Sequence, residues 1–134
     1  MIYGIGHDVL EISRMAHILA GKYADAFLNR VLTPAERELA VERKGRLAEF
    51  VAGRFAAKEA VTKAFGCGIG QIIGFSDMNI LPEPGGKPVV YLSSSAWDRL
   101  KLPNMGHLNY NIHLSITHQP NIASAFVIVE YKET

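Results

Sequence analysis

The chain has 134 residues, of which 49% are apolar, so it can bury the core of one domain over residues 1–134, and a disordered protein is excluded. A net charge of +1 gives no support to nucleic-acid binding, and the single cysteine, Cys67, fits a reducing, cytoplasmic environment. No membrane partner is expected, because the longest apolar stretch, near Ile122–Val129, is too short to span a bilayer. The N-terminus also differs from a signal peptide.

The N-terminal part of the chain predicts a strand followed by helices. Met1–Asp8 is apolar and ends in Gly-x-Gly-x-Asp, which indicates a short strand leading into a turn. Val9–Gly21 and Tyr23–Leu32 have apolar residues at helical spacing. A third helix begins at Thr33, where a threonine cap, a proline and a glutamate form a capping box, and it extends to about Lys44.

The central helix is the most informative element of the sequence, and it is expected from about Arg46 to Phe65. Its alanines favour a helix, and Gly66 and Gly68 supply its end. At about 100° per residue, one face contains only small side chains, which would let another backbone come close. That face consists of Gly53, Ala56, Ala57, Ala60 and Ala64.

The second half of the chain predicts mainly strands. Two pairs of strands and one short helix are expected: Phe75–Leu81 with Pro88–Leu92, a helix that is capped by Ser94 or Ser95 and ends at Leu100, and Asn109–Thr117 with Ala123–Tyr131. Helices first and antiparallel strands later predict an α+β fold, with the N-terminal helices packed on a C-terminal antiparallel sheet.

Four ionisable residues lie on the central helix, and they are the first candidates for a site. Arg54, Lys58, Glu59 and Lys63 occur on a helix that is otherwise apolar enough to be buried, where unpaired charges are costly. A phosphate-rich ligand with a metal ion would satisfy all four together. The alternative is a solvated helix face, because Glu59 and Lys63 have the spacing of an ordinary surface ion pair.

Two further groups of polar residues have both a functional and a structural interpretation. Asp8 follows two glycines that would admit a ligand or another backbone, but its spacing to Glu11 also suits a helix cap. Along the predicted strand, His113, Ser115 and Thr117 share the face opposite the core. That row could line a site or simply face solvent.

Basic residues on the first helices form a third candidate surface. Arg14, His17 and Lys22 lie on the polar side of the first helix, and Arg30 follows soon after. These side chains suit either solvated surface or a cationic patch for an acidic partner.

Three motifs, in this order, resemble holo-acyl-carrier-protein synthase, the short type of phosphopantetheinyl transferase. The motifs are GIGHDVLEISR at residues 4–14, GRFAAKEAVTKAFGCGIG at residues 53–70 and HLSITH at residues 113–118. The resemblance implies that the 4′-phosphopantetheine arm of coenzyme A is moved to a serine of apo acyl carrier protein, releasing 3′,5′-ADP and supporting fatty acid biosynthesis. The alternative is a module that binds coenzyme A or a nucleotide without transferring the arm. The longer transferase class is disfavoured by chain length.

The resemblance also implies roles for individual residues. Asp8 and Glu59 match metal-binding carboxylates for Mg²⁺, and with Lys63, which matches a position near the phosphates, they form the expected catalytic set. The base that accepts the serine proton stays open between a metal-bound water and a carboxylate. Arg14 would contact the acidic carrier protein, and a homotrimer with active sites at subunit boundaries is expected. The residues expected to bind the coenzyme are Arg54, Lys58, Lys63, Gly66, Gly68, His113 and Thr117.

Overall fold

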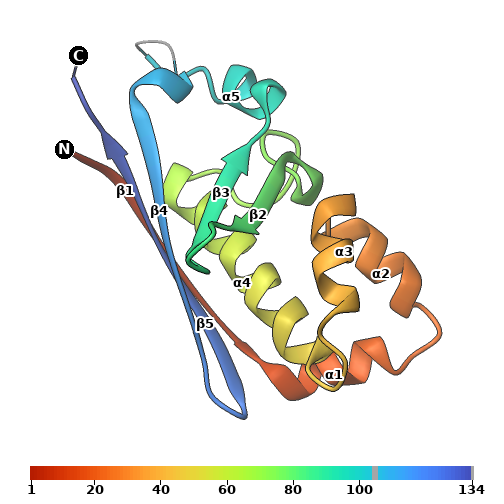
Figure 1. The fold of residues 1–134 in the computed structure, drawn as a ribbon. Coiled ribbons are helices and arrows are strands. Elements are labelled where there is room, and N and C mark those ends of the chain that lie inside the picture. The colour runs from red at the N-terminus through yellow and green to blue at the C-terminus, as the bar shows by residue number, and fades with distance from the viewer. Residues whose placement is uncertain (104–105, 134) are drawn as a thin grey trace.

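The protein has an α+β fold, as the sequence predicts, and its elements are arranged in layers. It is described here from a computed structural model that covers residues 1–103 and 106–133. In Figure 1, a sheet of β1, β5 and β4 forms one side, α4 lies behind it, α1, α2 and α3 lie beyond α4, and the hairpin β2–β3 lies between β4 and α3. The elements are β1 (Ile2–Glu11), α1 (Ile12–Leu19), α2 (Ala24–Val31), α3 (Pro34–Val41), α4 (Leu47–Phe65), η1 (Phe75–Asp77), β2 (Met78–Pro82), β3 (Pro88–Leu92), α5 (Ser94–Leu100), η2 (Gly106–Leu108), β4 (Tyr110–His118) and β5 (Ile122–Tyr131).

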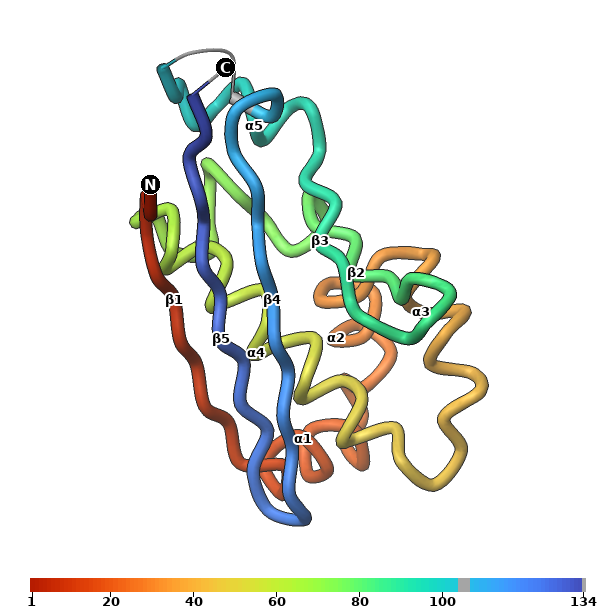
Figure 2. The backbone as a smooth tube through the Cα atoms, turned by 60° about the vertical axis from the view of Figure 1, so that its left-hand side comes forward, coloured from red at the N-terminus to blue at the C-terminus, as the bar shows by residue number. Residues whose placement is uncertain are grey.

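The main sheet joins the two ends of the chain. Its strand order is β1-β5-β4, and both pairs are antiparallel, so the N-terminal strand pairs with the C-terminal strand. Figure 2 looks onto the outer face of these strands, and no other described element crosses it. The inner face is shielded from solvent, because four residues of β5 are fully buried: Ala123, Ala125, Val127 and Val129. Phe126 points outward and is 43% exposed.

Strand β1 and helix α4 lie so close together that only glycine fits at two positions of the strand. A Cβ added at Gly4 would lie 1.8 Å from the carbonyl oxygen of Ala64, and one added at Gly6 would lie 1.8 Å from that of Ala60. The predicted small-residue face of the helix is therefore confirmed as a close backbone contact. This contact fixes the position of α4 relative to the edge of the sheet that carries Asp8.

A buried ion pair connects α3 to α4. Lys58 and Glu36 are both completely buried, with Lys58 Nζ 2.6 Å from Glu36 Oε1. The ammonium also donates to the carbonyl oxygens of Val31, at 2.7 Å, and Phe75, at 3.1 Å. Glu36 in turn completes the predicted capping box of Thr33. One charged pair thus joins the end of α2, the start of α3, the middle of α4 and η1.

A second polar cluster connects η1 to α5. Asp77 accepts hydrogen bonds from the hydroxyl of Ser93, from the backbone N–H of Gly74 and from Arg99 Nη2, at 2.7–2.8 Å. Burial alone would raise the pKa of Asp77, but these hydrogen bonds outweigh burial and lower it. Arg99 also donates to the carbonyl oxygen of Ile72, so the cluster holds the segment that follows α4.

Element boundaries differ from the prediction at several places. Helix α3 ends at Val41 and not at about Lys44. Strand β1 continues to Glu11, so Asp8 lies inside a strand and does not cap α1, whose first residue is Ile12. The chain forms a 3-10 turn at Phe75–Asp77 before β2 begins. Ser93 caps α5, one residue before the predicted cap. Within the described residues, no helix is long and apolar enough to cross a membrane.

Candidate functional site

Asp8 and Lys63 form the centre of the candidate site, on the edge strand of the sheet and on α4. Lys63 Nζ lies 2.9 Å from Asp8 Oδ1 and 3.0 Å from the carbonyl oxygen of His7. Side chains on both partners remain accessible, with 49% of Lys63 and 18% of Asp8 exposed. The close contact between β1 and α4 brings these residues together, because it places this part of β1 directly beside the last turns of the helix.

Glu59 lies one turn before Lys63 on the same face of α4, and the negative charge of Asp8 affects the pKa of its carboxyl group. Burial, and next the negative charge of Asp8, raise the pKa of Glu59, while Lys63 opposes this rise. Two carboxylates that influence each other in this way favour a cation between them. The described residues contain no group of three or more metal-binding side chains. The pair nevertheless suits Mg²⁺, which is commonly held by one or two carboxylates together with substrate phosphates.

A hollow of about 300 Å³ opens beside the two carboxylates. It is lined by Asp8 and Glu59, by Arg14 from α1, and by apolar side chains such as Ile18. Arg14 is exposed at the rim. The structure therefore places the predicted partner-binding residue next to the predicted metal-binding pair.

The segment after α4 has the backbone geometry that its glycines predict. Gly66 ends the helix with φ of 80°, and Gly68 has φ of 65°, a region that side-chain-bearing residues rarely adopt. This segment begins three residues beyond Lys63 in the chain. The backbone N–H groups of Gly66, Cys67 and Gly70 donate to carbonyl oxygens within the chain, which leaves the N–H of Gly68 as the candidate donor to a phosphate at that end of the helix.

Lys58 and Arg54 do not join Glu59 and Lys63. The interpretation of Lys58 as a coenzyme-binding residue is wrong for this structure, because its ammonium is fully buried and its hydrogen bonds go to Glu36, Val31 and Phe75. Arg54 is only 9% exposed and donates from Nε to the carbonyl oxygen of Ile80. Helical geometry puts Arg54 about 140° around the helix axis from Glu59.

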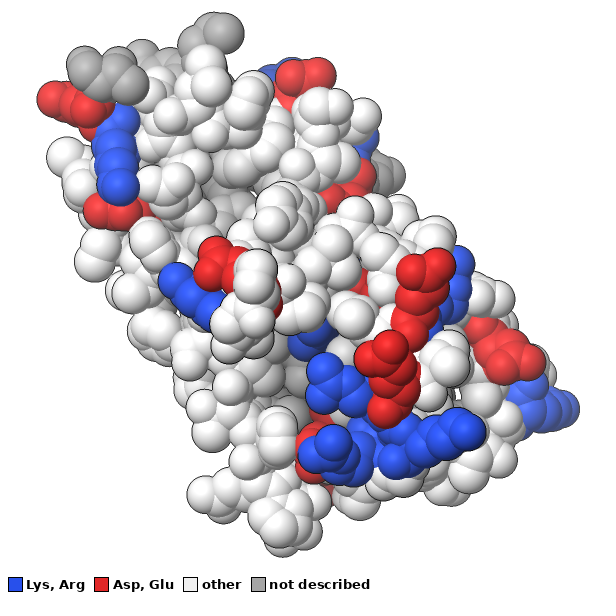
Figure 3. Space-filling view, viewed as in Figure 1, with Lys and Arg blue, Asp and Glu red and all other residues white. Residues whose placement is uncertain are grey.

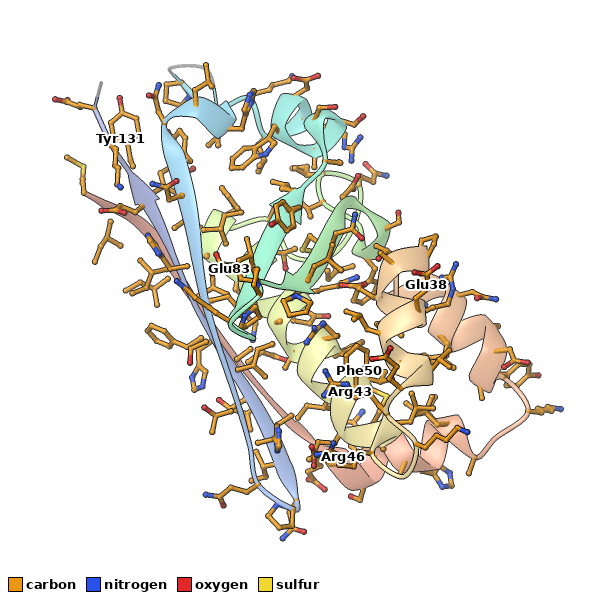
Figure 4. All side chains as sticks on the ribbon, viewed as in Figure 1. Glu38, Arg43, Arg46, Phe50, Glu83 and Tyr131 are labelled. Atoms are coloured by element: carbon orange, nitrogen blue, oxygen red, sulfur yellow. The ribbon has the colours of Figure 1, made fainter. Side chains whose placement is uncertain are left out.

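Arg54 instead belongs to a cationic hollow on the opposite side of α4. Arg43, Arg46 and Arg54 line it around Phe50, with the guanidinium carbons of Arg43 and Arg54 at 5.2 Å and 4.6 Å from the ring centroid. Figure 4 shows Arg43, Arg46 and Phe50 close together at the start of α4, and in Figure 3 blue side chains gather in the same region. The hollow has a volume of about 200 Å³ and also contains His118.

The sequence reading missed Arg43 and Arg46. Their signal was weak, because charged residues at the end of a helix are usually solvated. They gather only because the connection between α3 and α4 folds back over Phe50. A run of basic residues directly before the central helix was the one available hint.

His113 and Thr117 lie on the outer face of β4, as the alternation of the strand predicts. His113 Nε2 is 3.0 Å from Glu130 Oε1 of the neighbouring strand, and this hydrogen bond is the main reason that the pKa of Glu130 is lowered. Thr117 is exposed. Neither residue reaches Asp8 within one chain, because β4 and β1 are at opposite edges of the sheet.

Comparison with known proteins identifies the class that this fold and site define. A sequence model described as the 4'-phosphopantetheinyl transferase superfamily matches residues 4–121, and the chain belongs to that family. It is 44% identical over 131 residues to a holo-[acyl-carrier-protein] synthase of Bacillus cereus, covering 97% of both chains. The resemblance inferred from the three sequence motifs is thereby confirmed.

Solved structures of similar proteins share the whole fold. A holo-(acyl-carrier-protein) synthase of Bacillus anthracis in complex with CoA (3',5'-ADP) is 41% identical, with a TM-score of 0.81 over 98% of this chain and 99% of that one. The holo-[acyl-carrier-protein] synthase of Neisseria meningitidis is 32% identical, with a TM-score of 0.85 over 97% and 99% of the two chains.

Proposed function

We propose that this protein transfers the 4′-phosphopantetheine arm of coenzyme A to a serine of an apo acyl carrier protein, releasing 3′,5′-ADP and supporting fatty acid biosynthesis. The observation that carries the proposal is the meeting of Asp8, Glu59 and Lys63 at one edge of the sheet in a member of this family. In the reaction, the serine oxygen bonds to the phosphorus that carries the arm. The bond from that phosphorus to the oxygen shared with ADP breaks, and the hydroxyl proton passes to a base.

The three residues have complementary roles in this reaction. Asp8 and Glu59 would hold Mg²⁺, since carboxylate oxygens are the ligands it prefers and the pair already favours a cation. When bound, the ion would supply positive charge that stabilises the pyrophosphate and the departing 3′,5′-ADP. Lys63, whose side chain is half exposed, can contact Asp8 and a phosphate oxygen at the same time.

The charges of α4 support a site that is shared between subunits. Asp8 lies on the β1 edge of the sheet, whereas the hollow with Arg43, Arg46 and Arg54 contains residues of β3 and β4, beyond the other edge. Coenzyme A carries a pyrophosphate next to its pantetheine arm and a separate phosphate on the 3′ position of the ribose, and these groups would contact both places only if the β1 edge of one chain met the β4 edge of another. Contacts between unlike edges can close into a ring, and we expect a homotrimer.

Subunit mixing tests the shared site. Glu59→Gln removes the carboxylate edge and Arg46→Ala weakens the cationic edge, so each variant alone should have little activity. After the two variants are refolded together in equal amounts, about a quarter of the boundaries should combine two intact edges and recover activity. No recovery in mixed assemblies would contradict the shared site while leaving the transfer reaction intact.

The carrier protein is expected to dock beside Asp8. Arg14 lines the hollow next to the carboxylates, and its charge suits an acidic partner. Arg14→Glu should raise the Michaelis constant for the carrier more than that for coenzyme A, and the effect should weaken in high salt. Equal effects on both substrates would count against docking at this helix.

A direct assay separates transfer from mere binding. Apo acyl carrier protein is incubated with coenzyme A, Mg²⁺ and the enzyme, and its mass is followed for the gain of one phosphopantetheine group. Asp8→Asn and Glu59→Gln should each abolish most of the gain, whereas Glu38→Gln, an exposed residue on α3, should not. Binding of coenzyme A without any mass change would favour the alternative of a binding module.

A further inference from the structure

An apolar hollow lies where α2, α3 and the start of α4 meet, away from the candidate site. Its volume is about 260 Å³, and its walls consist of five apolar side chains and one cation: Leu28, Leu32, Ala40, Val41, Leu47 and Arg37. It shares no lining residue with the hollow beside Asp8 or with the cationic hollow around Phe50. The proposed function therefore assigns no role to it.

Helical spacing explains why these side chains gather around one hollow. Leu28 and Leu32 are four residues apart at the C-terminal end of α2, and Arg37 and Val41 are four residues apart on α3, so each pair forms a ridge on its helix. Only Leu32 and Thr33 connect the two helices. Leu32 is buried, whereas Val41 is 70% exposed. The hollow therefore extends from solvent at Val41 to the apolar core at Leu32.

Arg37 is the single polar side chain of this lining, and its position is fixed. Its Nη1 donates to the carbonyl oxygen of Leu32 at 2.6 Å, which uses only one of the several N–H groups of the guanidinium. Within the described residues, no carboxylate forms an ion pair with Arg37. The hollow thus combines a held cation, which still has hydrogen bonds to donate, with apolar walls.

A ligand that fits this hollow has one negative charge and an aliphatic tail. A guanidinium matches a carboxylate well, because both groups are planar and can form two parallel hydrogen bonds. A phosphate monoester, with a charge of about −1.5 to −2, would meet only one cation here. A methylene group is about as large as a water molecule, which takes up about 30 Å³ of the liquid, so the hollow has room for about eight methylene groups.

We infer that this hollow binds an aliphatic carboxylate of about eight carbons, with the carboxylate on Arg37 and the tail along Leu28, Leu32 and Val41. The Arg37 guanidinium would give the ligand its orientation, and burial of the tail would give most of the affinity. Each methylene that is fully removed from water strengthens binding by about fourfold. The inference goes beyond the proposed function and does not depend on it.

Calorimetry with octanoate as the probe tests this site in the full-length protein. A ligand of this size should bind with a dissociation constant of about 1 mM or lower. Hexanoate, which has a shorter tail, should bind at least about fivefold more weakly. Octan-1-ol has the same tail without the charge, and it should also bind at least about fivefold more weakly than octanoate.

Two substitutions separate the binding of the head from that of the tail. Arg37→Met removes the cation and should weaken octanoate by about tenfold, while octan-1-ol changes by less than about twofold. Val41→Glu, at an exposed position that folding does not need, places a negative charge beside the tail and should weaken octanoate by about fivefold or more. Lys44→Met removes an exposed cation outside the hollow and is the matched control, with an expected change of less than about twofold. A melting curve shows that each variant is folded.

Several results would overturn the site. One is the lack of saturable octanoate binding at about ten times the expected dissociation constant. Equal weakening by Arg37→Met and Lys44→Met would also refute it, because this would indicate general attraction to a positive surface. Equal affinities of hexanoate and octanoate would exclude a buried tail. If octanoate does not bind and Val41→Glu changes the assembly size in light scattering, the hollow belongs to a contact between copies of the chain. None of these measurements uses transferase activity, so the site and the proposed function can fail separately.

Discussion

Replacing Lys58 with methionine tests the view that this lysine is structural. The substitution keeps an unbranched side chain that is only one atom shorter, but it removes the ammonium, which lies 2.6 Å from Glu36 Oε1 and donates to the carbonyl oxygens of Val31 and Phe75. Because the lysine and Glu36 are fully buried, Lys58→Met leaves the Glu36 carboxylate without its cation and takes one donor away from each of two carbonyl oxygens. Breaking a buried pair in this way costs about 3–5 kcal/mol.

The loss of stability caused by Lys58→Met can be measured against a matched variant. For a chain of 134 residues, each kcal/mol lowers the melting temperature by about 4 °C, so Lys58→Met should melt about 12–20 °C earlier. Urea unfolding, followed by the fluorescence of the single tryptophan, Trp97, gives the free energy at a fixed protein concentration. Lys63→Met is the same change on the same helix at a half-exposed position, and it should cost less than about 1 kcal/mol.

Two further measurements decide the interpretation of Lys58. In a double-mutant cycle, Glu36→Gln with Lys58→Met should destabilise less than the two single changes added together, by about 1 kcal/mol or more. At a temperature where Lys58→Met stays folded, its Michaelis constant for coenzyme A should be unchanged. A loss of stability no larger than that of Lys63→Met, or a large rise in this constant, would refute the structural role.

Three other features lead to simple tests. Gly6→Ala should lower the free energy of unfolding by about 3 kcal/mol or more, because the added Cβ would meet a carbonyl oxygen of α4. Gly85→Ala is the control, since its added Cβ enters open space, and it should change stability by under about 1 kcal/mol. Equal effects of the two substitutions would contradict the close contact between β1 and α4. Because the pKa of Asp77 is lowered in the folded protein, its carboxylate stabilises the fold above the ordinary carboxylate pKa, and this stabilisation is lost as pH falls. The difference in the free energy of unfolding between wild type and Asp77→Asn should therefore narrow from about pH 7 to about pH 3. A difference that stays constant over this range would exclude a stabilising role for the Asp77 carboxylate. Phe126→Lys should reduce both the assembly size seen by light scattering and transferase activity, and Tyr23→Lys, another exposed aromatic, should change neither; a fully active Phe126→Lys monomer would exclude the shared site.

The central helix could be predicted from sequence because its signals are local. Alanine content, the glycine stop and the spacing of small residues act within a few turns, and helix α4 follows the prediction closely. The ambiguity at Asp8 was different in kind. Whether this residue caps a helix or lies in a strand depends on β1 pairing with β5, which places Asp8 opposite Ala125. That pairing joins residues far apart in the chain, and no local pattern determines it.

The sequence also did not predict which charged residues of α4 are buried and which stay exposed. Periodicity places Arg54 and Lys58 on a different side of α4 from Glu59 and Lys63, but it does not tell which side faces another layer of the protein. That depends on where α3 docks and therefore on the position of Glu36, whose carboxylate meets Lys58 across 22 positions of sequence. The carboxylate of Glu36, together with the carbonyl oxygens of Val31 and Phe75, thus makes Lys58 a structural residue, while Lys63, five residues later, stays partly exposed.

The same sorting explains why such a small domain divides its charged residues between two places. Helix α4 crosses the sheet and presents Glu59 and Lys63 toward the β1 edge, while Arg54 joins Arg43 on the other side. One continuous cleft holding both sets would have to interrupt the tight contact between β1 and α4, where no additional atom fits. In the proposed shared site, a neighbouring copy of the chain would bring the two partial sites together, so that the domain would keep its packed core and still bind coenzyme A.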